Sequence, residues 1–442
     1  VGSRAMPGHL ALALAHLGHS VRIAPVVGAP VPAACARRPL NVRIDGVWRD
    51  LSKWRAAHPA GTHWIDGYSD ADATEAMQAF HSDEAMHMLS RLPVSTSSPV
   101  GVPEPTPLTL SFRQFRAELV QEGYWKRSAW REAATLAPCI ALFVAGTLLA
   151  QRHALIATFL LAIGSTASGW LAHDYVHGRG RWCALMRPFG ALTNGHSSSW
   201  WSNKHNLHHA RTNEVGVDED IMSDPFFFLW APDPARDVQW RKYQHLYIAP
   251  VYSILFALWR FNSLKTVATS RLWRTEGPPL ALNYLWLALL PAPVAIGHVL
   301  LAGLMSATIV TVTHQSEEMF DGPQHDWVDA QFRSTRDAVT SNPFSEWLWG
   351  GMQYQLEHHL FPTMPRYRYR QLAPRLKRWA AAHGAEYRED TEAQVLLRNF
   401  RMLRDVAGAA AVPGAPATRS NGVFSQRQGA AWIPPVGKPL SS

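Results

Sequence analysis

Long apolar runs are the feature that most constrains this chain. Residues 134–150 and 154–172 contain no charged side chain, and a helix needs about 20 mostly apolar residues to cross the hydrocarbon core of a bilayer. The short segment 151–153 between them predicts a tight turn and a helical hairpin. Residues 279–297 and 298–313 predict a second hairpin, shorter and interrupted by prolines. We therefore expect an α-helical integral membrane protein with four transmembrane helices in two hairpins.

The composition supports a membrane protein with one positively charged side. The chain is 47% hydrophobic and 17% charged, below the quarter or so of charged residues typical of soluble domains. Residues 173–278 carry twelve Lys and Arg, whereas the hairpin tips carry only Arg152. The positive-inside rule then predicts that the long segments are cytosolic. Residues 245–261 form either a fifth span or a segment in the membrane interface, and we expect the interface, because Tyr, Trp and Arg are spread through them.

The charge pattern and the cysteines argue against a nucleic-acid-binding protein and against a fold held by zinc or disulfides. The net charge of +8 could attract nucleic acid or an anionic membrane surface. Since no run of Lys and Arg is interleaved with aromatic residues, we expect a lipid membrane as partner and no nucleic acid. The three cysteines are far apart and form no CxxC pair, which argues against a zinc finger or a disulfide framework. They are Cys35, Cys139 and Cys183.

Changes in composition divide the chain into parts. A Pro- and Ser-rich stretch separates a small soluble domain from the apolar region, and the C-terminal end is rich in Ala, Pro, Gly and Ser, as disordered tails are. The expected parts are an unassigned segment 1–40, a small domain 41–93, a linker 94–109, the membrane domain 110–407 and a disordered tail 408–442.

Histidines recur in three short clusters next to the ends of the apolar runs. The first is HDYVH, the second HNLHH and the third QLEHH, and their members are His173, His177, His205, His208, His209, Gln355, His358 and His359. Residues three and four apart share one face of a helix, so each cluster is expected to direct its side chains to one point. Imidazole suits Zn, Cu, Fe and Ni. Seven histidines exceed the needs of one tetrahedral zinc, which predicts two metal ions. His314, at the end of the fourth run, lies at the same expected depth and is predicted as a further ligand.

The small domain carries a second pair of histidines. Residues 41–51 alternate like a strand, and residues 72–89 have helical spacing with Asp72 as a candidate N-cap. His58 precedes and His81 lies within this helical pattern. Two imidazoles on opposite sides of a haem iron leave no open coordination position, so such a haem carries electrons and does not activate oxygen.

Residues 41–90 resemble a cytochrome b5 domain. The resemblance is carried by VRIDGVWRDL, by HPAG and by SDADATEAMQAFHS. It implies that His58 and His81 bind haem b. Ala60 stands where the family has a glycine of its His-Pro-Gly-Gly motif. If that residue requires a positive φ, the extra Cβ costs about 1–2 kcal/mol.

From about 110 to 400 the chain resembles the front-end membrane fatty acid desaturases. The resemblance is carried by HDYVH, WWSNKHNLHHARTN, VTHQSEE and WGGMQYQLEHHLFPTMPR, and a glutamine in place of the first histidine of the third box marks the front-end subgroup. It implies a cytosolic helical cap in which the eight histidines hold two non-haem irons, with Gln355 beside them at the catalytic centre. It also implies an amino-terminal cytochrome b5 domain.

The same resemblance implies the reaction and the partners. O2 is the co-substrate, and a cis double bond forms between the carboxyl end and an existing double bond of a polyunsaturated acyl chain. Reduction of O2 to water takes four electrons: two come from the acyl C–H bonds and two from NADH through a separate cytochrome b5 reductase and the haem. The substrate is carried on coenzyme A or a phospholipid, and the expected location is the endoplasmic reticulum membrane.

Two other interpretations stay open at this point. A sphingolipid long-chain-base desaturase or a lipid hydroxylase could use the same scaffold, and product analysis separates them from an acyl desaturase. A non-catalytic haem protein that carries electrons at the membrane belongs to a different class. Bound iron of about two per chain beyond the haem would exclude it.

Overall fold

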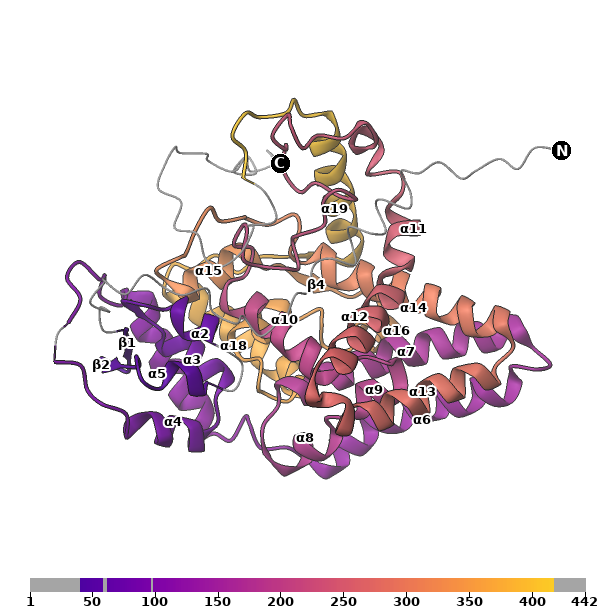
Figure 1. The fold of residues 1–442 in the computed structure, drawn as a ribbon, viewed down its shortest axis with the longest axis horizontal. Helices are drawn as coiled ribbons and strands as arrows, with labels where there is room; N and C mark the ends of the chain where they lie inside the picture. Colours follow the sequence, from indigo (N-terminus) through magenta and orange to yellow (C-terminus); the bar gives the residue numbers. More distant parts are fainter. Residues whose placement is uncertain (1–39, 59–61, 97, 417–442) are drawn as a thin grey trace.

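The computed structural model describes residues 40–58, 62–96 and 98–416. A small domain lies at one end of the molecule, the long apolar helices at the other, and a cap of shorter helices between them (Figure 1). Most of the unassigned segment 1–40, the departure at Ala60 and the tail beyond residue 416 fall outside the described residues.

Three helices in the described ranges are long and apolar enough to cross a membrane: α6 (Ala129–Leu149), α7 (Ala154–His177) and α14 (Ala292–Val312). The predicted turn between the first two is present, because α6 ends at Leu149 and α7 begins at Ala154. Helix α7 packs against both α6 and α14. The fold is thus mostly helical, with several apolar helices that suit a membrane protein.

The second hairpin differs from the prediction in where it turns. The apolar runs predict a break near residue 297, but helix α13 spans Gly277–Leu289 and Pro291 is the N-cap of α14. Pro291 and Pro293 set the break, since proline fits the first turn of a helix and disrupts its interior. As a result α14 is longer than predicted, and α13 is shorter than the other three helices.

Residues 245–261 do not form one continuous helix. They follow a 3-10 turn, η2 (Gln239–Tyr243), and are divided between α11 (Ile248–Ser253) and α12 (Leu255–Thr269). Both helices pack against α14. Neither is long enough to be a candidate span in the described chain.

The small domain joins a three-stranded sheet to short helices. The strand order is β2-β1-β3, from β1 (Asn41–Ile44), β2 (Val47–Asp50) and β3 (Ala71–Asp72). Its helices are η1 (Arg55–Ala57), α2 (Thr62–Asp66), α3 (Thr74–Phe80) and α4 (Asp83–Ser90). Val42, Ile44 and Leu51 form the core with Leu89.

Two local predictions in this domain need correction. Residues 41–51 form a hairpin and not a single strand, because Asp45 and Gly46 both have positive φ, as a tight two-residue turn requires. The helical pattern over 72–89 is broken at His81 and Ser82, and Ser82 caps α4 by accepting from the Ala85 N–H. Asp72 is also not the N-cap of α3, which is Ala73, although its Oδ1 accepts from the Thr74 N–H at 2.9 Å.

The cap surrounds the inner ends of the apolar helices. Its core lies where α5 (Pro107–Gln121) meets α15 (Trp327–Ser334), α17 (Gln355–Leu360) and α18 (Tyr369–Ala382). The other elements are α8 (Gly180–Met186), α9 (Phe189–Asn194), α10 (Ser198–Ala210), η3 (Arg271–Arg274), β4 (Asp337–Val339), α16 (Pro343–Trp349), η4 (Arg366–Arg368), β5 (Glu389–Thr391) and α19 (Glu392–Gly408). Strands β4 and β5 pair in parallel.

The described parts of the predicted linker and tail are held by specific contacts. Arg43 of β1 donates to Glu104 Oε1 at 2.9 Å and to the Pro103 carbonyl at 2.6 Å. Beyond α19, the Val412 N–H donates to the Pro232 carbonyl at 2.9 Å. The described part of the predicted tail, residues 408–416, thus begins with the last residue of α19 and continues along the surface of the cap.

Candidate metal centre and substrate cavity

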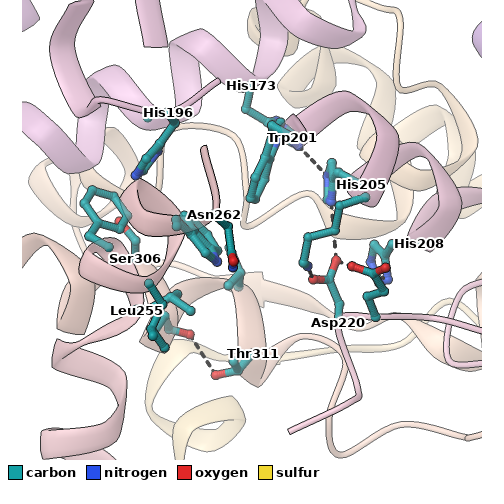
Figure 2. Close-up of a pocket in the computed structure, with 18 of the residues that line it drawn as sticks. His173, His196, Trp201, His205, His208, Asp220, Leu255, Asn262, Ser306 and Thr311 are labelled. Atoms are coloured by element: carbon teal, nitrogen blue, oxygen red, sulfur yellow. Dashed lines mark hydrogen bonds and ion pairs between the residues drawn. The ribbon is translucent and has the colours of Figure 1, made fainter. Parts of the chain in front are cut away.

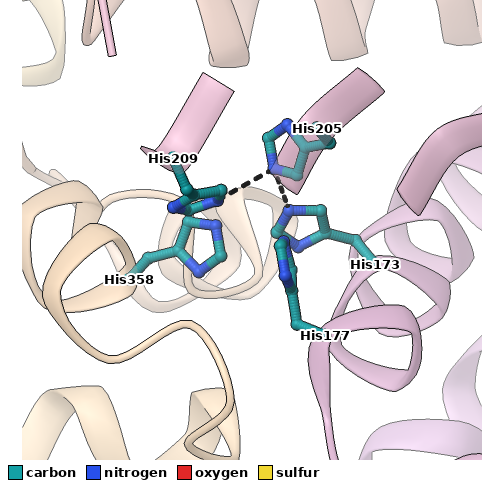
Figure 3. A group of neighbouring side chains, drawn as sticks. All are labelled: His173, His177, His205, His209 and His358. Carbon is teal, nitrogen blue, oxygen red and sulfur yellow. Dashed lines mark hydrogen bonds between the residues drawn. The ribbon is translucent and has the colours of Figure 1, made fainter. Parts of the chain in front are cut away.

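Five histidines from three helices converge on one point. The ring nitrogens available as ligands in this first group lie within 4.8 Å of one another, and the side chains are those of His173, His177, His205, His209 and His358. Helix α7 supplies two of them, α10 two and α17 one (Figure 3). All five are buried. This arrangement can surround one metal ion.

A second group lies beside the first. Its ring nitrogens, from His208, His314 and His359, also lie within 4.8 Å of one another, and all three side chains are buried. Gln355 Nε2 lies 2.6 Å from His314 Nε2, which places the glutamine at this second group. The structure thus brings the eight predicted histidines and the predicted Gln355 together.

The first cluster directs both of its histidines to the first group, as expected, but the second and third clusters are divided between the two groups. In the second cluster His205 and His209 face the first group and His208 the second. In the third, His358 faces the first group and His359 the second. The reason is helical geometry: residues four apart share a face, whereas adjacent residues project about 100° apart. Each pair of adjacent histidines therefore spans both groups.

Unsatisfied nitrogens are consistent with metal binding. Both ring nitrogens of His177, and Nε2 of His358 and of His359, are buried without a hydrogen-bond partner among the described residues. Buried polar atoms in native proteins almost always have partners. Neutral imidazole nitrogens that face one another are the donor set that iron, zinc or copper accepts.

Carboxylate, amide and hydroxyl groups orient several of the rings through contacts with Nδ1. Asp218 Oδ2 lies 2.8 Å from His208 Nδ1, and Gln331 Oε1 lies 2.9 Å from His359 Nδ1. The Tyr369 hydroxyl lies 3.3 Å from His358 Nδ1. Such partners fix the ring and leave Nε2 for a metal. The sequence motifs point to none of the three. The acidic run 218–220, shortly after the second cluster, was the available signal for Asp218.

The environment keeps the rings neutral. Burial, reinforced by the neighbouring imidazoles, holds the pKa of His205, His209, His358 and His359 well below the ordinary value. Burial and His208 lower the pKa of His314 to about 3. A neutral imidazole has a free lone pair, so these rings are ready to bind a cation near neutral pH.

Glu357, within the third cluster, faces away from the histidines. Its Oε1 lies 2.8 Å from the Tyr387 hydroxyl, which is also 2.6 Å from Asp337 Oδ2. Burial, together with the nearby Asp337, raises the pKa of Glu357 well above its ordinary value. The Leu356 N–H donates to Asp337 Oδ1 at 2.9 Å. These bonds fasten α17 to β4, so Glu357 positions the helix that carries His358 and His359.

A cavity of about 1190 Å³ opens beside the histidines. Residues of both groups line one part of it: His173, His205, His208, His314, Gln355 and His358. Leu255, Ser306 and His196 lie away from His205 and His208 in the same cavity (Figure 2). Aromatic side chains such as Trp201 and Phe256 contribute to the walls. The volume exceeds the ~300–1,000 Å³ usual for small-ligand pockets, and suits a long apolar molecule.

The histidines of the small domain also face each other. The ring centroids of His58 and His81 are 6.2 Å apart, which leaves room for one metal atom bound by a nitrogen from each side. His81 Nδ1 lies 3.2 Å from the Met77 carbonyl, so Nε2 is left for the metal. Burial, with Arg179 and His58, lowers the pKa of His81 to about 4. The pair fits bis-histidine haem ligation.

Comparison with known proteins agrees with both sites. Residues 150–391 match the family described as fatty acid desaturase, and residues 36–96 match the cytochrome b5-like heme/steroid binding domain. An acyl-lipid (9-3)-desaturase of Physcomitrium patens is 30% identical over 398 residues, which cover 82% of this chain and 74% of the relative.

Two further relatives cover most of both chains. An acyl-lipid 8-desaturase of Rebecca salina is 28% identical over 389 residues, 82% of this chain and 91% of the relative. A Delta(6)-fatty-acid desaturase of Caenorhabditis elegans is 27% identical over 435 residues, 83% of this chain and 96% of the relative. The similarity therefore includes the small domain and the histidine-rich domain together.

Proposed function

Since the chain belongs to the fatty acid desaturase family and carries a cytochrome b5-like domain, we propose that it is a front-end desaturase. It introduces a cis double bond between the carboxyl end and an existing double bond of a polyunsaturated acyl chain, as relatives named Delta(6), Delta(5) and Delta(8) desaturases suggest. One observation carries the proposal: histidines of both groups form part of the wall of one large cavity.

The proposed metals are two non-haem irons. The five-histidine group holds one, and His208, His314 and His359 hold the other. The Ser334 carbonyl accepts from His314 Nδ1 and orients that ring, and Gln355 lies beside its metal-facing Nε2. When bound, the irons supply the O2-dependent oxidation that removes one hydrogen from each of two neighbouring acyl carbons. The protein contributes the geometry: the cavity walls hold the acyl chain so that one pair of methylenes lies against the histidine-lined part.

The apolar wall also sets where the double bond forms. Aromatic and aliphatic side chains exclude water and fix how far the acyl chain can enter. Arg236 is exposed and belongs to the cavity lining, where its charge suits the phosphate of coenzyme A or of a phospholipid head group. The length of cavity between Arg236 and the histidines then measures the chain from its carboxyl end.

The remaining assignments concern electrons and membrane. NADH supplies electrons through a separate cytochrome b5 reductase to haem b on His58 and His81. These residues belong to a haem domain 41–93, which the linker 94–109 joins to the desaturase domain 110–407.

We propose a multi-pass protein of the endoplasmic reticulum with α6, α7, α13 and α14 as spans and the histidines on the cytosolic side. Helix α13 has 13 residues and rises about 20 Å, a mismatch that local thinning of the bilayer accommodates.

Asp218→Asn is expected to weaken metal binding about 10–100-fold, because the amide cannot replace the carboxylate that orients His208. The purified chain is incubated with increasing concentrations of a chelator, and the iron that remains bound per chain is measured at each concentration. Asp321→Asn, at an exposed position, is the matched control and should retain iron as the unmodified chain does. Unchanged retention in Asp218→Asn would show that the Asp218–His208 contact does not support the metal.

A lipid profile tests the function as a whole. The chain is expressed in a host without polyunsaturated lipids, fed 18-, 20- and 22-carbon acids, and new double bonds are located by mass spectrometry. The expected product has a new bond on the carboxyl side of an existing double bond. New bonds in sphingolipid bases, or hydroxylated lipids, would replace the proposal by those activities. If no new lipid forms while NADH still reduces the haem, the result would favour a non-catalytic electron carrier.

A further inference from the structure

A direct ring contact connects the two proposed metal sites. Phe80 is the last residue of α3 and is bonded in the chain to His81. Its ring meets the imidazole of His209 edge-on, with the centroids 6.2 Å apart and the planes at 73°. His209 belongs to the five-histidine group. One aromatic ring thus lies between a proposed haem ligand and a proposed iron ligand.

The surrounding interface holds this contact in place. Ala76 and Ala79 of α3 pack with Phe80 against Ala210, the last residue of α10. The Tyr68 hydroxyl donates to the Ala210 carbonyl at 3.3 Å. Because Ala210 directly follows His209, these contacts fix α3 against the residue that carries the iron-facing ring.

Charged contacts with α5 hold another face of α3. Arg113 Nε donates to Glu75 Oε1 at 2.6 Å, and Arg116 Nη2 donates to the Gln78 carbonyl at 2.9 Å. The Glu75 carboxylate is 7% exposed. Ion pairs that are this well buried need good geometry to offset desolvation, which favours one defined docking position over a loose encounter.

We propose that Phe80 is the bridge through which electrons pass from the haem domain to the iron centre. The inference rests on the proposed function. In each transfer one electron leaves the haem iron and enters the iron held by His209; no bond forms or breaks, and Phe80 itself is unchanged. The route has a single through-space step, between the Phe80 and His209 rings, because the rest follows the covalent link from His81 to Phe80 and the metal–ligand bonds. The haem domain therefore works in this docked position.

The test uses the full chain with haem and iron bound, in lipid nanodiscs, without O2 or acyl substrate. No product forms under these conditions, so the readout is electron transfer alone. A flash-excited reductant reduces the haem, and the decay of its reduced absorbance reports the transfer to iron. We expect Phe80→Leu to slow this decay at least about tenfold, equal to ~1.4 kcal/mol in the barrier, with unchanged haem spectrum, haem potential and iron content.

Two matched variants separate the ring from the docking. Phe80→Tyr keeps the ring and is expected to keep the rate. Tyr68→Phe removes a hydrogen bond from the same interface, and its rate should stay within about twofold, less than 0.5 kcal/mol. A decay in Phe80→Leu within twofold of the unmodified chain overturns the proposal, as does an equal loss of rate in Phe80→Tyr.

A distance measurement on the unmodified chain keeps the proposal testable if Phe80→Leu fails to bind haem. With Cu²⁺ in place of iron, pulsed electron paramagnetic resonance between the ferric haem and the copper should give one short, narrow distance. A broad or long distribution would show an undocked haem domain and overturn the bridge. Failure of the proposed function is distinct, because it is read from the lipid products of the unmodified chain and not from the transfer rate or the distance.

Discussion

Replacing His358 with alanine is expected to abolish double-bond formation while the chain still folds and inserts. The ring is 2% exposed and lies 4.5–4.6 Å, centroid to centroid, from those of His209 and His173. Its Nε2 has no partner among the described side chains. Loss of a metal ligand should exceed the ~10–100-fold cost of losing a group that only orients one. New double bonds, counted by mass spectrometry as in the feeding test, should fall by more than about 100-fold.

The control is His383→Ala, at an exposed position on the surface end of α18, where product yield should be unchanged. Iron content, measured by elemental analysis and corrected for haem, should fall in His358→Ala and stay near two per chain in His383→Ala. Full activity in a well-expressed His358→Ala protein would remove His358 from the ligand set. Lost activity with a changed melting temperature would instead indicate a folding defect, which His358→Asn, closer in volume, resolves.

The parts of the site that sequence predicted are those set by short-range chemistry. Residues four apart on α7 and α10 share a face whatever the tertiary fold, so helical spacing alone predicts the pairs His173–His177 and His205–His209. Apolar length identified α6 and α7 in the same way. Gln355 is predicted from its place in the third cluster and His314 from its place at the end of an apolar run, but their 2.6 Å contact depends on the packing of α14 against the cap.

The parts that sequence could not predict depend on contacts between distant segments. Gln331 lies 28 residues from His359 in the chain, and its amide reaches that ring only because α15 packs on α17. Which member of each adjacent histidine pair faces which metal group depends on the relative rotation of α10 and α17. The contact of Phe80 with His209 joins two domains, and no periodicity in either domain contains that information.

His58→Ala is expected to remove the low-spin haem spectrum and, with it, NADH-dependent desaturation. His58 and His81 face each other with centroids 6.2 Å apart, and His81 is oriented by the Met77 carbonyl. With only one axial imidazole left, the haem iron loses its six-coordinate, low-spin state. Absorbance spectra of the purified chain, oxidised and after reduction by dithionite, report the bound low-spin haem. Product yield with NADH and a cytochrome b5 reductase reads the electron supply.

The matched control is His87→Ala, an exposed histidine on α4 in the same domain, which should keep both spectrum and yield. The two metal sites are expected to separate in this experiment: His58→Ala should retain about two irons per chain, because the histidines of the cap do not depend on haem. A retained low-spin spectrum in His58→Ala would refute the bis-histidine assignment. A lost spectrum with unchanged NADH-dependent product would show that electrons reach the irons without this domain, and would overturn the role of Phe80 as well.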